Sequence, residues 1–104
     1  MEERLQALLR LALRYSASKI YLSNAKGQSQ IEMCVDDIFA KVKGRREDWE
    51  LPYYMKHLLG LDIYNGALQS KSFDYELDGV SRHLKYTCVR LGDNEFGIID
   101  LFSL

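Results

Sequence analysis

The sequence is poor in the residues and patterns that mark several specialised classes of protein. It has one proline, two cysteines and no repeat or low-complexity tract in 104 residues. With 47% hydrophobic residues and a net charge of only −1, it lacks the composition of a disordered chain. Cys34 and Cys88 form neither a CxxC pair nor a disulfide framework, which fits a reducing cytoplasm. We therefore expect one small folded domain over residues 1–104.

Two further absences narrow the choice of partner. Fourteen basic residues against fifteen acidic ones give none of the basic excess that nucleic-acid binders carry. No apolar run approaches the ~18 residues that a membrane span needs, so no direct membrane insertion is expected. The start of the chain, MEER, carries acids and lacks a cleavage site, so no secretory signal is predicted there. A cytoplasmic protein that neither binds nucleic acid nor inserts in a membrane is the expectation.

Motifs of several enzyme classes are also missing. The chain has no G-x-x-x-x-G-K-[ST], no G-x-G-x-x-G and no G-x-S-x-G. His57 and His83 have no Cys or His near them at the spacing of a metal site. We therefore expect no catalytic residue, no metal and no cofactor, and a protein that is not an enzyme.

Two residue pairs could form a chemical site, but each has a simpler structural interpretation. Cys88 and His83 could form a nucleophilic pair, but both cysteines fall in predicted strands, where such a residue is usually a small buried hydrophobe. Asp36 and Asp37 could bind a cation, but two adjacent acids between strands are more typical of a tight turn.

The first half of the chain reads as a helix, three strands and a second helix. Residues 2–15 place Leu5, Leu8, Leu9, Ala12 and Leu13 at helical spacing, with Arg4, Gln6, Arg10 and Arg14 facing elsewhere. Alternating and β-branched residues predict strands over 19–23, 30–35 and 38–42. Residues 44–50 (GRREDWE) read as a charged loop. A helix with Pro52 in its first turn is predicted through 53–59, with Gly60 as a cap at its end.

The second half reads as three strands. Phe73, Tyr75 and Leu77 alternate with polar residues over 71–77, and Asp78-Gly79 is a hairpin signal before 83–91. A turn over 92–94 precedes a final strand over 96–101. The fold class is α+β: a mostly antiparallel sheet of five to six strands with two helices, in the order α-β-β-β-α-β-β-β.

One segment offers candidate contact residues. Trp49 follows Arg45 and Arg46 in the charged loop, and exposed Trp and Arg are favoured at binding hot spots. Trp49 could instead pack on the helix that follows. The acids Asp74, Glu76 and Asp78 could bind a basic partner, although such a stripe is more often the solvated side of a half-buried sheet.

Several segments together resemble a known family. They are the first helix, ASKIYL at 17–22, VDD at 35–37, LLGLDI at 58–63 and SFDYELDGV at 72–80. In this order they resemble the N-terminal domain of the type II secretion, type IV pilus and competence traffic ATPases of bacteria. Lys19, Tyr21 and Asp37 stand where that family has Asp, His and Gly.

The resemblance implies a PAS-like fold that precedes a RecA-like ATPase domain and packs on the neighbouring subunit of a hexameric ring. By position, Lys71 and Lys85 would correspond to basic residues near the bound phosphates. The function expected from it is a non-enzymatic regulatory or assembly domain that acts through protein contacts. Its partner would be an ATPase motor domain or the secretion or pilus machinery, and a homo-oligomer is an open option.

The alternative is a stand-alone PAS-like sensor that binds a small ligand between sheet and helix. Tyr54, Phe73, Tyr75 and Tyr86 could line its pocket, or they could form the core.

Overall fold

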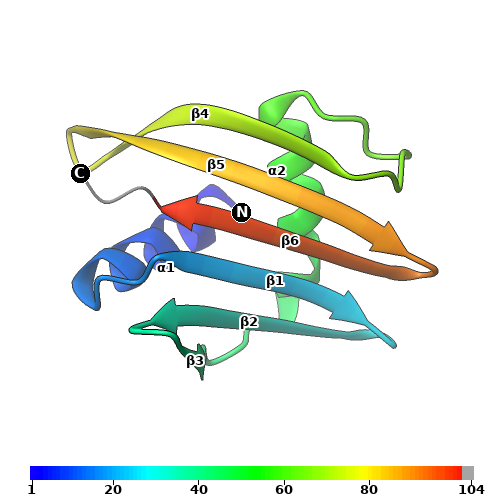
Figure 1. The fold of residues 1–104 in the computed structure, drawn as a ribbon, viewed down its shortest axis with the longest axis horizontal. Coiled ribbons are helices and arrows are strands. Elements are labelled where there is room, and N and C mark those ends of the chain that lie inside the picture. Colours follow the sequence, from blue (N-terminus) through cyan, green and yellow to red (C-terminus); the bar gives the residue numbers. More distant parts are fainter. Residues whose placement is uncertain (102–104) are drawn as a thin grey trace.

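Two α-helices lie against one face of a six-stranded antiparallel sheet (Figure 1). A computed structural model describes residues 1–101; the predicted domain also includes residues 102–104, which lie outside the described residues. The elements are α1 (Glu2–Arg14), β1 (Lys19–Ala25), β2 (Gln28–Val35), β3 (Ile38–Lys41), the 3-10 helix η1 (Arg46–Glu50), α2 (Leu51–Leu59), β4 (Gln69–Leu77), β5 (Val80–Leu91) and β6 (Asn94–Leu101). The predicted α+β class and PAS-like element order are confirmed.

The strands follow the order β3-β2-β1-β6-β5-β4, and every neighbouring pair is antiparallel. The last strand, β6, inserts beside β1, where Lys19 lies opposite Asp100 and Asn24 opposite Glu95. Two three-stranded meanders are thereby joined into one sheet. β3 and β4 form its two edges.

Tight turns fix the register of the hairpins. Asp36 and Asp37 have φ values of 50° and 64° in the turn between β2 and β3. Asp78 and Gly79, at 52° and 80°, repeat this geometry between β4 and β5. A two-residue turn with positive φ at both positions matches the twist of a hairpin, and Asp and Gly tolerate it. The turns predicted at 36–37 and 78–79 are confirmed.

Side chains alternate between a helix-covered face and an open face of the sheet. The core is formed by helix residues and covered strand residues, among them Leu5, Leu8, Leu9, Ala12, Leu51, Met55, Ile20, Leu22, Ile31, Met33, Tyr86 and Ile99. Neither helix covers the opposite side of the sheet, the open face, on which Lys19 pairs with Asp100 at 3.7 Å and Tyr21 packs edge-on against Phe39. The helices thus cover one side of the sheet.

Three predictions at the helices were wrong in detail. The segment 44–50 is not a loop throughout, because Arg46–Glu50 form a 3-10 helix that leads directly into α2. Arg4, expected to face away from the core, is only 7% exposed because it is paired with a buried acid, Asp48. Leu13, expected on the apolar face of the first helix, is 36% exposed. No helix within residues 1–101 has the length and apolar character needed to cross a bilayer.

Candidate functional site

Trp49 lies on the surface of η1 and is 54% exposed. Its ring packs edge-on against Tyr53 of α2, with centroids 6.4 Å apart. Two depressions, of about 410 and 380 Å³, adjoin these two rings, and Arg46 lines the second. We call Arg46, Trp49 and Tyr53 the Trp49 surface. Trp49 packs on the next helix, as one of its two interpretations expects, and about half of its area is exposed.

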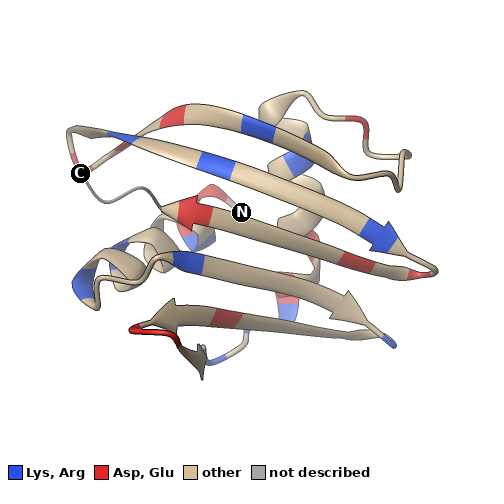
Figure 2. Cartoon of the chain, viewed as in Figure 1, with Lys and Arg blue, Asp and Glu red and all other residues tan. Residues whose placement is uncertain are grey.

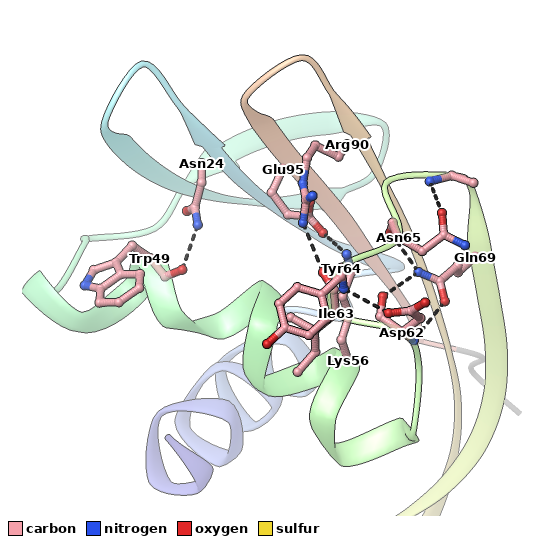
Figure 3. A network of polar contacts seen from close by, with 11 residues as sticks. Asn24, Trp49, Lys56, Asp62, Ile63, Tyr64, Asn65, Gln69, Arg90 and Glu95 are labelled. Atoms are coloured by element: carbon pink, nitrogen blue, oxygen red, sulfur yellow. Dashed lines mark hydrogen bonds and ion pairs between the residues drawn. The ribbon is translucent and has the colours of Figure 1, made fainter.

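The main chain beneath this surface is anchored at two points. Asn24 of β1 donates a hydrogen bond from Nδ2 to the carbonyl oxygen of Trp49 at 2.6 Å (Figure 3). On the other side, the buried Asp48 carboxylate accepts two bonds from the Arg4 guanidinium, at 2.8 and 2.9 Å. Asp48 also accepts the backbone N–H of Arg45 at 2.7 Å, which caps the start of η1. The loop therefore presents Trp49 in a fixed position.

The structure separates the three predicted contact residues. Arg46 and Trp49 share one depression, whereas Arg45 lines a different groove of about 750 Å³ between α1 and the β3 edge. The lining of the groove is mostly apolar, with Leu11, Val35, Ile38 and Val42, and also includes the charged residues Asp36, Lys41 and Lys43. Arg45 and Arg46 are adjacent in the sequence, but Arg45 lines the groove and Arg46 belongs to the Trp49 surface.

The two lysines suggested by the resemblance are not brought together. On β4 and β5, Lys71 lies opposite Tyr86 and Lys85 lies opposite Ser72, so the two side chains stand on opposite faces of the sheet. Lys71 donates from Nζ to the carbonyl oxygen of Leu59 at 2.8 Å, at the end of α2. Lys85 stands on the open face. They do not form one cationic pair.

A buried ionic cluster lies between α2 and the sheet. Lys56, fully buried, places Nζ 2.5 Å from Oε1 of Glu95, which is also buried. The second carboxylate oxygen accepts from Nε of Arg90 at 3.1 Å, and Arg90 also donates to the carbonyl oxygen of Ile63 at 3.0 Å. Figure 3 shows this cluster continuing into the segment 62–69, where Gln69 bonds the main chain of Asp62 and Asn65. It fixes the connection between α2 and β4.

Sequence reasoning missed this cluster. Lys56 falls within the predicted helix 53–59, and Glu95 lies between the predicted turn 92–94 and the predicted strand 96–101. The only local signal is weak: Lys56 lies one residue after the buried Met55, on the inward side of a short helix.

The aromatic residues named for a ligand pocket belong to the packed layer instead. Tyr86 is fully buried over Gly97, and Tyr54, Phe73 and Tyr75 pack against the core. Burial raises the pKa of the Tyr86 hydroxyl well above its ordinary value. These four aromatic side chains therefore belong to the hydrophobic core or pack directly against it.

Both cysteines are buried, as predicted. Burial raises the pKa of the Cys88 thiol, which disfavours the reactive thiolate. His83 lies opposite Asp74 on the open face, whereas Cys88 lies opposite Gly97 on the covered face. The two side chains therefore cannot act as a nucleophile and its base.

The arrangement of helices and strands recurs in a solved motor protein. The crystal structure of the pilus retraction motor PilT with bound ADP matches 94% of this chain with a TM-score of 0.57. The chain shares the fold of part of that motor. Sequence identity is 13%, and the match spans 29% of the length of the PilT chain. No protein-family model matches the sequence, and no curated protein does.

Proposed function

We propose that the chain is a non-enzymatic regulatory or assembly domain that contacts protein next to an ATPase motor, as the N-terminal domains of traffic ATPases do. The observation that carries the proposal is the fold match to PilT, which covers nearly all of this chain and less than a third of the motor. The absence of a G-x-x-x-x-G-K-[ST] motif from the 104 residues fits a domain that adjoins a motor.

The Trp49 surface is the contact site in this proposal. A half-exposed Trp beside Arg46 and Tyr53 has the composition of an interface hot spot. The bonds from Asn24 and Arg4 order the loop beforehand, so a partner would not have to order it on binding. The neighbouring depressions offer room for protruding side chains of the partner.

Of the two lysines, only Lys85 is proposed to lie near bound nucleotide. Its side chain stands on the open face, where a neighbouring subunit could bring phosphates. Lys71 is assigned a structural role because its ammonium group bonds the last turn of α2. As a lysine, Lys85 would contribute charge and not the two-pronged geometry of an arginine.

Site-specific photo-cross-linking in the source cell tests the proposal. A photoreactive phenylalanine analogue replaces Trp49, and a matched one replaces Tyr64, which is 90% exposed and lies outside the Trp49 surface. The expected result is an adduct from position 49, absent from position 64, that mass spectrometry assigns to a P-loop motor domain. Adducts of equal yield from both positions, or to a protein without a P-loop, would contradict it.

The purified chain should also release no phosphate from ATP above the buffer control. Hydrolysis that co-purifies with the chain and is lost on a point substitution would show that it is an enzyme.

A further inference from the structure

On the open face, the two edge strands of the sheet carry charges of opposite sign. β4 exposes Asp74 and Glu76, whereas β3 and the residue pair after it expose Lys41 and Lys43. In Figure 2, β3 and β4 lie at opposite edges of the sheet, and each has both acidic and basic positions in or beside it. No contact within one copy joins them, because four strands lie between β3 and β4.

The edges also match in the distribution of apolar side chains. On the covered side, β3 and the next residue carry Ile38, Ala40 and Val42, while β4 carries Phe73, Tyr75 and Leu77. On the open side stand Lys41 beside the exposed Phe39 at one edge, and the two carboxylates at the other. Toward the helices both edges are mainly apolar, with Lys71 of β4 as the exception, and toward the open face their charges are complementary.

The main chain presents its outward hydrogen-bonding groups at the same charged residues. Val42 donates its N–H inward to Ile31 at 2.9 Å, so the alternate residue Lys41 directs its backbone groups outward. At the other edge, Leu77 closes the two-residue turn to β5 and bonds inward, so Asp74 and Glu76 face outward. A ladder between the two edges would place these residues directly opposite one another.

Strand direction allows the same pairing. Neighbouring strands alternate in direction across six strands, so β3 and β4 run antiparallel to each other. A copy displaced along the sheet therefore brings its β4 antiparallel to β3, with the helices of both copies on one side. This contact is head to tail, since different surfaces of the two copies meet.

We infer that the chain self-associates by adding β4 of one copy to β3 of the next. Registers that place Lys41 opposite Asp74 or Glu76 differ by two residues, and both pair a cation with a carboxylate. A shift of one residue would put apolar groups on the open face, which disfavours it. A strand pair alone buries little area, so the association is weak and salt-sensitive. The inference does not depend on the proposed motor partner.

Charge reversal on each edge tests this inference. In analytical ultracentrifugation at low salt, the wild type should show concentration-dependent association that weakens at about 1 M salt. Lys41→Glu/Lys43→Glu and Asp74→Lys/Glu76→Lys should each raise the dissociation constant by about tenfold or more, since like charges then meet. An equimolar mixture of the two variants should associate again, because each supplies the edge that the other needs.

Two further variants separate the edge contact from a loss of folding. Ser72→Pro removes an outward N–H of the edge strand and should abolish association with an unchanged circular dichroism spectrum. Lys26→Glu, in the turn between β1 and β2, adds negative charge away from both edges and should associate like the wild type. A monomeric wild type, variants that still associate, or a mixture that stays monomeric would each overturn the inference. Binding of an acidic peptide to the groove without self-association would do so as well.

Discussion

At residue 97 a side chain is excluded because the ring of Tyr86 occupies its place. A Cβ on Gly97 would come within 2.8 Å of Cε1 and Cζ of Tyr86, and still closer to the hydroxyl oxygen. Tyr86 is fully buried and has no open space to enter. We expect Gly97→Ala to lower the free energy of unfolding by about 1–3 kcal/mol, the usual cost of overpacking a core, measured by urea denaturation.

Gly44 provides the matched control. A Cβ there would meet only Oδ2 of Asp48 at 3.9 Å, so Gly44→Ala should change stability by less than about 0.5 kcal/mol. Gly97→Ala with Tyr86→Leu should cost less than the sum of the two single substitutions, because the added Cβ then no longer meets the tyrosine ring. Equal stability of Gly97→Ala and the wild type would mean that the ring does not lie over residue 97.

The buried pair of Lys56 and Glu95 gives a second prediction at this scale. Lys56→Met leaves the Glu95 carboxylate buried with Arg90 as its remaining cation, and should cost about 3 kcal/mol of folding free energy. Lys56→Met/Glu95→Leu should cost less than the sum of the two single substitutions, because no buried charge is then left unpaired. Additive losses in a double-mutant cycle would contradict the coupling.

At the scale of elements, Arg10 ties α1 to the turn between β4 and β5. Its guanidinium bonds both carboxylate oxygens of Asp78, at 2.8 and 2.9 Å, and these bonds hold the pKa of Asp78 below its ordinary value. Such a group adds stability above its unfolded pKa and loses that contribution as the pH falls through the folded pKa. The contribution is small because both side chains are exposed.

Asp78→Asn is the variant that measures this contact, since Asn also tolerates the positive φ of the turn. The wild type should melt slightly above the variant at neutral pH. The difference should shrink as the pH falls below the ordinary pKa of an aspartate and vanish below the lowered pKa of folded Asp78. A difference that persists at low pH would assign the effect to the turn and not to the ion pair.

Local patterns were sufficient to predict most elements. The alternation of apolar and polar residues at 71–77 predicted β4, and the apolar spacing at 2–15 predicted α1. Each pattern indicates which side of the element is buried. The turns at 36–37 and 78–79 were predictable because Asp and Gly tolerate left-handed backbone. The 3-10 helix was missed because GRREDWE has no apolar period, and its contacts include bonds with Arg4 and Asn24, which lie far away in the sequence.

The site was less predictable than the fold. Exposure of Trp49 followed from its charged surroundings, but the separation of Arg45 from Arg46 did not. Arg4 and Asp48 stand 44 residues apart, and no local period signals a partner at that distance. Charged residues that pair in the interior look like surface residues in sequence, so such pairs emerge only from the tertiary structure.

At the scale of the whole molecule, the fold presents a fixed tryptophan surface on one loop and has no nucleophilic pair in Cys88 and His83. The chain has a single tryptophan, so its indole N–H gives one resolved signal in a nitrogen–proton NMR spectrum. Trp49→Ala should change the melting temperature by no more than a few degrees, because half of the side chain is already exposed. A larger loss would place Trp49 in the core and not at an interface.

The most direct measurement is therefore a titration of the isotopically labelled chain with the P-loop motor domain identified by cross-linking. The account predicts that the indole signal of Trp49 and the amide signals of Arg46 and Tyr53 shift together, and that Trp49→Ala weakens binding by about 30-fold or more. An unmoved indole signal, or equal affinity of Trp49→Ala and the wild type, would contradict it.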